Sequence, residues 1–373
     1  MIYFDNAATS FPKPNSVIKE VVRCLNTYCG NSGRSSHRMA MLASEKIYET
    51  RCKVADFFCA SKSENIIFTY NATYALNFAI KNEAEEGTHI LMSDMEHNSV
   101  ARPVYKLKNE KKCDFDIFSS EGDIIKNLSA LLRKNTRLLI CNHISNVSGR
   151  ILPVEEIGAF CKKHKICFIL DASQSAGHIS TDIKKIGCDI LCAPAHKGLF
   201  GIQGCGLVIF ENTKGIKEFI VGGSGTNSNS PHMPTALPER LEAGTLSTPA
   251  IASLSSGIDF IKSVGLPSIE EREKVLRNML IERLASIKDV FICDNDKNCS
   301  SVISFHQKDI KSEIIGTYLD NCGICVRSGL HCAPIAHKTL NTSDNGTVRI
   351  SLGYFNTINE IDAFYKKMKE FKI

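Results

Sequence analysis

Through the first two-thirds of the chain, a short apolar run ending at Gly, Asp, Asn or Ser recurs again and again. Five such runs are HILMSD, RLLICNHISN, ICFILDASQ, CDILCAPAHK and GCGLVIF, and each has the length typical of a buried strand. Between the runs, apolar residues recur at helical spacing, as at Ala40, Ala43, Ile47, Val54 and Phe58. Strands that alternate with helices predict a mostly parallel sheet with helices on both faces.

Beyond about residue 250 the pattern changes to longer amphipathic helices. One apolar face is formed by Ile251, Leu254, Ile258 and Ile261, and a second by Leu276, Met279, Leu280, Leu284 and Ile287. Two strand-like runs follow, SSVISFHQ and GICVRSG. With a length of 373 residues, the chain is expected to form two domains. We predict a large domain over residues 14–250 and a smaller α+β domain from residues 1–13 and 251–373.

The last helix is predicted to begin after Thr357. The spacing from Thr357 to Glu360 fits a capping box, in which each side chain accepts a hydrogen bond from the other residue's backbone N–H. Helical periodicity then predicts an inward face formed by Ile358, Ile361, Tyr365 and Met368.

Composition argues against several classes of function. The 45 basic and 40 acidic residues leave a formal charge of +5, which is too small and too scattered for a nucleic-acid-binding surface. No window approaches the ~18 consecutive apolar residues of a membrane span, and the N-terminus lacks the pattern of a secretory leader. We expect a cytoplasmic protein, in which the 16 cysteines are thiols and mostly buried.

Polar residues follow several predicted strands, at the edge where a parallel sheet binds ligands. They are His97, Asn146, Asp171, Gln174, His196 and Lys197. A lysine can form a Schiff base with an aldehyde, and a carboxylate can keep a pyridinium nitrogen protonated; pyridoxal phosphate needs both groups. Asp171 and Lys197 therefore suggest this cofactor, although their spacing alone fits a helix cap and a surface lysine equally well.

A possible phosphate site lies in the stretch FTYNATYALNFAI, where a strand runs into a helix whose first turn carries Asn71, Ala72 and Thr73. Free N–H groups at a helix N-terminus attract anions, and ordinary capping is the alternative interpretation. A dinucleotide site is disfavoured because no G-x-G-x-x-G motif follows the first strand, and GIQGCG precedes a strand instead of a helix.

Taken in order, these motifs resemble the cysteine desulfurases of the class V aminotransferase group. The resemblance covers nearly the whole chain and rests on YFDNAATS, EHNS, SNVSG, LDASQSAGH, HKGLFGIQG, RLEAGTLST, VRSGLHCAP and VRISLGYFNT. It implies an α/β fold of the fold-type I pyridoxal-phosphate class, with a mostly parallel central sheet and a smaller α+β domain. It also implies conversion of L-cysteine to L-alanine with pyridoxal 5'-phosphate as cofactor.

The resemblance assigns a role to each matching residue around the cofactor ring. Lys197 would hold the cofactor as a Schiff base, and Asp171 would face the pyridine nitrogen. Gln174 would reach the phenolic oxygen. His97 would stack on the ring and take part in proton transfer.

The resemblance also implies residues for the phosphate and the substrate. Asn146 and Arg349 would orient the substrate carboxylate, for which the parallel donors of a guanidinium are suited, and Arg327 is included among the substrate-binding residues. The phosphate would be held by Ala72, Thr73, His196 and Thr226. Where the family commonly has Ser or Thr, this chain has Pro194, which offers neither a hydroxyl nor an N–H. Ala72 likewise contributes only its backbone N–H.

Cys332 is the cysteine to which the resemblance gives a chemical role. Arg327, Gly329, His331 and Cys332 fill the pattern Arg-x-Gly-x-His-Cys, in which the family places its nucleophile. Cys332 would take sulfur from the substrate as a persulfide and pass it to a sulfur-acceptor protein. Arg327 and His331 would favour the reactive thiolate. The other cysteines need no catalytic role, and the single C-x-x-C at Cys322 does not indicate a metal site.

The segment from Gly222 to Thr245 is rich in Gly, Ser, Asn and Pro and long for a connection, so we expect it to be functional or mobile. In the family this loop reaches the other subunit, which implies a homodimer whose phosphate site, including Thr226, is shared between subunits.

Other functions stay open at this point. A selenocysteine lyase would use the same residues on L-selenocysteine. A class V aminotransferase or another pyridoxal-phosphate lyase would keep Lys197 and Asp171 but would not need Cys332. A non-catalytic binding protein would not need a lysine, an acid, a histidine and a cysteine together. The sequence does not identify the sulfur acceptor.

Overall fold

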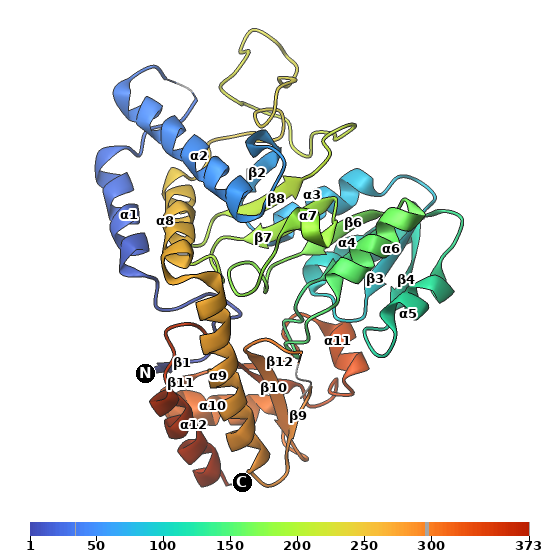
Figure 1. The fold of residues 1–373 in the computed structure, drawn as a ribbon, viewed down its shortest axis with the longest axis vertical. Helices are drawn as coiled ribbons and strands as arrows, with labels where there is room; N and C mark the ends of the chain where they lie inside the picture. Colours follow the sequence, from blue (N-terminus) through green and yellow to red (C-terminus); the bar gives the residue numbers. More distant parts are fainter. Residues whose placement is uncertain (34, 295–297, 373) are drawn as a thin grey trace.

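The structure, a computed structural model, describes residues 1–33, 35–294 and 298–372. Two regions are visible, a larger one around a seven-stranded sheet and a smaller one around a four-stranded sheet (Figure 1). Both chain termini lie in the smaller region, and the long helix α9 (Leu266–Ala285) runs from the larger region into the smaller one.

The seven-stranded sheet confirms the predicted mostly parallel architecture. Its strands follow the order β2 (Ile66–Thr69), β8 (Gly206–Phe210), β7 (Ile190–Pro194), β6 (Cys167–Asp171), β5 (Thr136–Asn142), β3 (Thr88–Ser93) and β4 (Cys113–Phe118). From β7 to β4 all neighbours are parallel, whereas β8 is antiparallel to both β2 and β7. All five apolar runs of the sequence became strands of this sheet.

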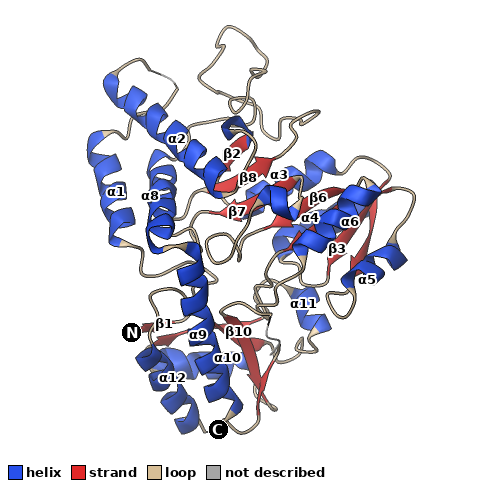
Figure 2. Cartoon of the chain, viewed as in Figure 1, coloured by secondary structure: helices blue, strands red, loops and turns tan. Residues whose placement is uncertain are grey.

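Helices cover both faces of the sheet, as expected (Figure 2). Ile90, Ile140 and Ile169 point to one face and pack with α3 (Ala72–Glu83) and α4 (Asn98–Asn109). Leu91, Leu139 and other alternate residues point to the opposite face. That face is covered by α2 (Arg38–Phe57), α5 (Ile124–Leu131), α6 (Val154–His164), α7 (Ile183–Ile186) and α8 (Thr248–Val264). Strands buried on both sides explain why the runs are continuously apolar.

Helix α8 belongs to the core of the larger region. It packs beside α1 (Asn15–Thr27) and α2, and its apolar face, including Ile251 and Leu254, is buried with the sheet. Gly265, with φ +88°, separates α8 from α9. We propose that the two domains divide near Gly265 instead of at residue 250.

The smaller region is an antiparallel sheet covered by helices. Its strands follow the order β12 (Arg327–Gly329), β13 (Thr347–Ser351), β10 (Val302–Gln307) and β9 (Val290–Ile292), and β1 (Ile2–Tyr3) pairs with β11 (Ile324–Cys325). Helices α9, α10 (Ser312–Asn321) and α12 (Ile358–Glu370) complete this core. The short α11 (Pro334–Thr339) instead packs its Ala336 against Met95 and Val147 of the larger region.

The predicted capping box at the start of α12 is present, with both reciprocal hydrogen bonds between Thr357 and Glu360. The predicted inward face needs one correction. Ile358 is 45% exposed, whereas Phe364 is fully buried. Ile358 is the first residue of the helix and lies beyond the edge of the core, while Phe364 packs against Phe4 and Phe305.

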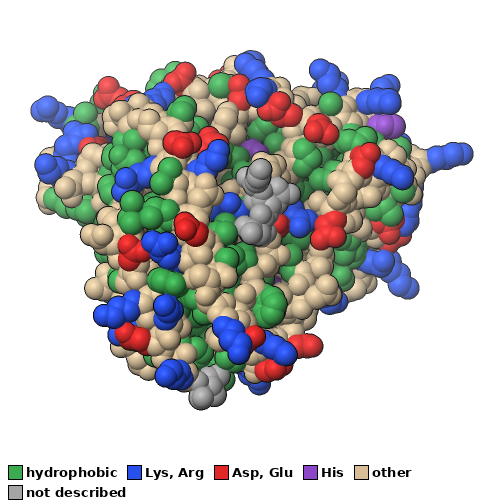
Figure 3. Space-filling view, turned by 60° about the horizontal axis from the view of Figure 1, so that its bottom comes forward, with side chains coloured by type: hydrophobic (Ala, Val, Ile, Leu, Met, Phe, Trp, Pro, Cys, Tyr) green, Lys and Arg blue, Asp and Glu red, His purple; other side chains and the backbone are tan. Residues whose placement is uncertain are grey.

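Basic and acidic side chains are interspersed on the face shown in Figure 3, as expected from the small net charge. None of the helices in the described residues has the length and apolar character required to span a membrane.

Candidate active site between the two regions

A cavity with an empty volume of about 540 Å³ lies at the carboxyl ends of the parallel strands. It brings together eight of the residues predicted from the sequence, namely Ala72, Thr73, His97, Asn146, Asp171, Gln174, His196 and Lys197. Parallel strands align their carboxyl ends at one sheet edge, which explains why residues far apart in the chain meet here. Pro194, Ser99 and Asn142 also line this cavity.

Asp171 is the last residue of β6, and Lys197 follows the end of the neighbouring strand β7. Asp171 is 4% exposed, and its Oδ1 accepts a hydrogen bond of 2.9 Å from the N–H of Ser173. Burial raises the pKa of Asp171 and lowers the pKa of Lys197 to about 8, while the charge of Asp171 opposes the shift of Lys197. Near neutral pH, Lys197 is therefore a free amine more often than an ordinary lysine.

The turn that carries Lys197 is held by close backbone contacts. A Cβ on Gly177, which has φ +90°, would lie 2.2 Å from the carbonyl oxygen of Gly198. A Cβ on Gly198 would lie 2.4 Å from that of Ala176. The hydroxyl of Ser10 also donates a hydrogen bond of 2.9 Å to the carbonyl of Lys197. The motifs LDASQSAGH and HKGLFGIQG therefore need glycine at Gly177 and Gly198, because the two turns pack directly on each other.

His97 occupies the N-cap position of α4, and its Nδ1 accepts a 3.0 Å hydrogen bond from the N–H of Ser99. Burial lowers the pKa of His97 to about 4, and the charges of Lys197 and three arginines add to this effect. The imidazole is therefore neutral at neutral pH. Gln174 donates a 3.0 Å hydrogen bond to the carbonyl of Ala7, which fixes its amide at the wall of the cavity.

The start of α3 provides the candidate phosphate site. Asn71 caps the N–H of Tyr74 at 3.0 Å, and the first N–H groups of the helix, at Ala72 and Thr73, have no acceptor within it. Gly206 of β8 allows this helix start to approach, because a Cβ there would lie 2.4 Å from the backbone of Asn71.

His196 and Pro194 lie at the same wall of the cavity. The Nδ1 of His196 is buried and has no hydrogen-bond partner in the described chain. Burial lowers the pKa of His196 to about 4, so that it is neutral. Pro194 ends β7 and presents no donor.

Arg349 and Asn146 meet at the junction of the two regions. Arg349 donates to the carbonyl of Asn146 at 3.0 Å and to Oδ1 of Asp5 at 2.7 Å, while its buried Nε has no partner in the described residues. Asn146 donates to the carbonyl of His331 at 2.9 Å, and its Oδ1 is also without a described partner. Sequence reasoning did not single out Asp5, although it lies in the motif YFDNAATS.

Cys332 is exposed and lies on a loop in which both His331 and Cys332 have positive φ, at 49° and 58°. The carbonyl of Cys332 accepts a 2.7 Å hydrogen bond from the N–H of Asn98, which is the residue after His97. The Nη2 of Arg327 lies 3.1 Å from the sulfur. The loop is therefore docked on the same helix start that holds His97.

The expectation that His331 favours the thiolate of Cys332 is wrong. Its imidazole is 2% exposed and turned inward, with Nε2 2.8 Å from the hydroxyl of Thr347. Burial lowers the pKa of His331 to about 2, so it carries no charge near neutral pH. Arg327 is the charged residue of the motif that contacts the sulfur of Cys332.

Thr226 does not line the cavity of its own chain. It lies with Ser224 and Asn227 in a separate pocket formed by the irregular segment between β8 and α8. Residues 222–245 contain no helix or strand, which agrees with the predicted loop.

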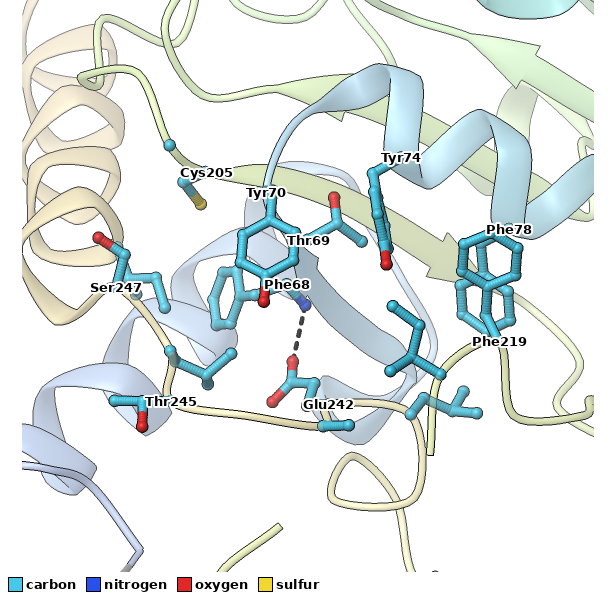
Figure 4. A pocket seen from close by; sticks show the side chains of 16 residues that line it. Phe68, Thr69, Tyr70, Tyr74, Phe78, Cys205, Phe219, Glu242, Thr245 and Ser247 are labelled. Atoms are coloured by element: carbon cyan, nitrogen blue, oxygen red, sulfur yellow. Dashed lines mark hydrogen bonds between the residues drawn. The ribbon is translucent and has the colours of Figure 1, made fainter. Parts of the chain in front are cut away.

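Beside the start of α3 lies a second, aromatic pocket, lined by Phe68, Tyr70, Tyr74 and Phe219 (Figure 4). Glu242 accepts a 2.7 Å hydrogen bond from the N–H of Phe68, drawn as the dashed line in Figure 4. The same carboxylate forms two hydrogen bonds with Arg51, at 2.9 and 2.8 Å. The buried ion pair fastens the irregular segment to α2, and the hydrogen bond from Phe68 fastens it to β2, the strand that precedes α3.

The cysteines are all free thiols, and Cys29, Cys59 and Cys332 are exposed. Within residues 1–33, 35–294 and 298–372, no three His, Cys, Asp or Glu side chains are grouped so that they could hold a metal ion.

A mostly parallel sheet that presents a partly buried lysine and a buried carboxylate at adjacent strand ends is the arrangement of the fold-type I class, whose members use pyridoxal phosphate. The comparisons agree, because the family model described as Aminotransferase class-V matches residues 2–364. The chain belongs to this family and, within it, to the cysteine desulfurases.

The relatives that support this assignment match over most of their length. Probable cysteine desulfurases of Borreliella burgdorferi and Pyrococcus abyssi are each 34% identical over 99% of this chain, and the matches cover 91% and 94% of the respective relatives. The solved apo structure of a cysteine desulfurase from Thermococcus onnurineus NA1 matches with a TM-score of 0.91 and 31% identity, over 99% of this chain and 94% of that chain.

Proposed function

We propose that the protein is a pyridoxal-phosphate-dependent cysteine desulfurase that converts L-cysteine to L-alanine and keeps the sulfur on Cys332. The observation that carries the proposal is the convergence of three groups in one chain. Lys197 and Asp171 meet in the cavity, and Cys332 is docked on the helix that begins next to His97. An aminotransferase needs Lys197 and Asp171, whereas sulfur transfer also needs Cys332.

The residues of the cavity fit pyridoxal phosphate. Lys197 has the lowered pKa of a Schiff-base lysine, and Asp171 is a buried carboxylate suited to a pyridinium nitrogen. The open N–H groups of Ala72 and Thr73 suit the phosphate. Buried polar atoms without a described partner, Nδ1 of His196 and Oδ1 of Asn146, are available for further contacts.

When bound, the cofactor would withdraw electrons from the α-carbon of the substrate. Side chains of the protein would move the protons and orient the substrate. Lys197 would remove the α-proton, because burial lowers the pKa of its amine to about 8 and so makes the free base more accessible than in an ordinary lysine. Asp171 would hold a proton on the ring nitrogen, and the N–H of Ser173 supports its negative charge. Asn146 and Arg349 would orient the substrate carboxylate, with Asp5 limiting how much of the guanidinium is free.

Cys332 would complete the reaction. Its thiolate attacks the sulfur of the substrate, so that an S–S bond forms as the C–S bond breaks. The electron pair of the C–S bond stays on the substrate carbon, which becomes the methyl group of alanine after protonation. The guanidinium of Arg327, 3.1 Å from the sulfur, would stabilise negative charge on that sulfur during the attack. A sulfur-acceptor protein would then collect the exposed persulfide.

The proposal extends to assembly and location. We place Thr226 in the phosphate site of a second subunit of a homodimer, because it does not line the cavity of its own chain. A nucleophilic thiol that must stay reduced fits the cytoplasm.

The first test is an absorption spectrum of the purified protein before and after addition of L-cysteine, with alanine and sulfide assayed alongside. We expect a Schiff-base band that changes with cysteine, and alanine formation that is lost in Cys332→Ala. Alanine formation that survives in Cys332→Ala would point to another pyridoxal-phosphate lyase. A protein that binds no cofactor would contradict the whole proposal. Parallel assays with L-selenocysteine would separate a desulfurase from a selenocysteine lyase.

A further inference from the structure

Ser99 contacts the cavity histidine with two groups. Its backbone N lies 3.0 Å and its Oγ 2.8 Å from Nδ1 of His97. The same hydroxyl lies 2.8 Å from Oγ1 of Thr73, at the start of α3. Ser99 is 7% exposed and therefore buried. One hydroxyl thus connects the helix start that carries the phosphate site with the helix start that carries His97.

This contact decides which nitrogen of His97 carries the proton. A backbone N–H can only donate, so Nδ1 must offer its lone pair. The proton of the neutral imidazole is then on Nε2. Nε2 makes no hydrogen bond among the residues that the structure describes, and His97 lines the cavity. The N–H of Nε2 is therefore the group that His97 offers to a molecule in the cavity.

We propose that Ser99 is a positioning residue that fixes His97 as the Nε2–H tautomer and ties its ring to Thr73. The proposal deepens the proposed function and rests on it for its catalytic meaning. In the resting site His97 is a hydrogen-bond donor, and Lys197 is the group that accepts the proton from the substrate. His97 can act as a base only after it has given up the proton on Nε2.

The surroundings oppose a second proton on His97. Charging the ring would place a proton on Nδ1, which would break the hydrogen bond from the backbone N–H of Ser99 and force the Ser99 hydroxyl to change from donor to acceptor. The cations that face His97 are Lys197, Arg327, Arg349 and Arg102. Together with burial, they lower the pKa of His97 to about 4.

The hydroxyls of Thr73 and Ser99 have one proton each. When Thr73 donates to Ser99, and Ser99 donates to Nδ1, both protons are used and Nδ1 receives two donors. If an anion in the phosphate site draws the proton of Thr73, the hydroxyl of Ser99 can still donate to Nδ1. The Nε2–H tautomer of His97 should therefore persist in variants at Thr73 and Ser99, because the backbone N–H of Ser99 remains, whereas the pKa of His97 should respond to the loss of the Ser99 hydroxyl.

The test is nitrogen-15 NMR of cofactor-free protein labelled at histidine, with the His97 signals assigned from His97→Gln. In the wild type we expect an unprotonated Nδ1 and a protonated Nε2 from neutral pH down to about pH 5. Ser99→Ala should shift the titration midpoint of His97 upward by about one pH unit, since one net hydrogen bond and one pKa unit are of similar size. Ser99→Thr, which keeps the hydroxyl, should restore the midpoint. Thr73→Val should leave the Nε2–H tautomer in place.

A wild-type His97 with its proton on Nδ1 would overturn the proposal, and this measurement needs no variant. An unchanged midpoint in Ser99→Ala would also overturn it. Because the spectra are taken without cofactor or substrate, they are independent of desulfurase activity. If the spectra match while no alanine is formed from L-cysteine, the positioning role stands and the proposed function fails.

Discussion

His178 and Glu273 form a largely buried ion pair that joins the two regions beside the turn that carries Lys197. The Nδ1 of His178 lies 3.0 and 2.9 Å from the two carboxylate oxygens of Glu273, on α9 of the smaller region. Glu273 also accepts a 3.1 Å hydrogen bond from Ser301. The ring of His178 packs against Gly198, where a Cβ would lie 2.5 Å from its Cδ2. Movement of α9 is therefore coupled to the backbone beside Lys197.

This ion pair should make stability depend on pH. Glu273 raises the pKa of His178 above its ordinary 6.5, against the opposing effect of burial. The stabilisation is therefore complete below the ordinary value and is lost as the pH rises through the higher folded-state pKa. We expect Glu273→Gln to lower the free energy of unfolding by about 2 kcal/mol at low pH.

Urea denaturation at about pH 6 and about pH 9, on either side of the titration of His178, would check this. The loss should be larger at the lower pH. Glu271→Gln, an exposed position on the same helix, is the matched control and should change stability little at either pH. An equal loss at both pH values would show that the charge of His178 does not contribute.

Lys197 should capture pyridoxal phosphate at a lower pH than an ordinary lysine. Only the free amine reacts, and burial lowers the pKa of Lys197 from 10.5 to about 8. The rate of Schiff-base formation, followed by absorbance with cofactor-free protein, should rise with a midpoint near that lower value. Asp171→Asn removes a charge that raises the pKa of Lys197, so its midpoint should move to lower pH. Lys197→Arg should show no capture, and a midpoint in the wild type above about pH 10 would contradict the prediction.

Arg327 should control the reactivity of Cys332. We expect Arg327→Gln to slow the alkylation of Cys332 by iodoacetamide about tenfold, because the sulfur loses a cationic hydrogen-bond donor 3.1 Å away. Peptide mass spectrometry would follow the label. Cys29 and Cys59, the other exposed cysteines, serve as internal controls, and a parallel slowing at all three sites would argue against a local effect.

Gly177→Ala should disturb the turn that carries Lys197. At φ +90° the new Cβ would be strained and would lie 2.2 Å from the carbonyl oxygen of Gly198. We expect a loss of about 3 kcal/mol or more in the free energy of unfolding, together with slower cofactor capture. Gly122→Ala is the control, since Gly122 has φ +70° but no atom within 4 Å of its Cβ position. That change should cost only about 1 kcal/mol.

A shared phosphate site can be tested by mixing two inactive variants. In a heterodimer of Lys197→Ala and Thr226→Val subunits, the second subunit keeps Lys197 and receives an intact Thr226 from the first. If Thr226 acts across the interface, the heterodimer should regain one working site. Its cofactor content per dimer should then be about half that of the wild type, which has two equivalent sites. If Thr226 acts within its own chain, the mixture should stay as weak in cofactor binding as the Thr226→Val protein alone.

The features that depend on local pattern could be predicted from the sequence. The apolar runs predicted five strands of the large sheet because a strand buried on both faces must be continuously apolar. The spacing of Thr357 and Glu360 predicted the start of α12 because capping involves only one helical turn. The polar residues after the strands predicted the cavity, because parallel strands align their carboxyl ends.

Which atoms face one another depends on long-range packing. It paired Arg349 with Asp5, 344 residues apart, and turned His331 inward while its neighbour Cys332 stayed exposed. It also placed Ser99 between His97 and Thr73. These contacts depend on the directions of side chains brought together from distant parts of the chain, and no local pattern encodes those directions. Local periodicity thus determined the elements and the edge of the sheet at which chemistry occurs, whereas long-range packing determined the charge, tautomer and exposure of each group there.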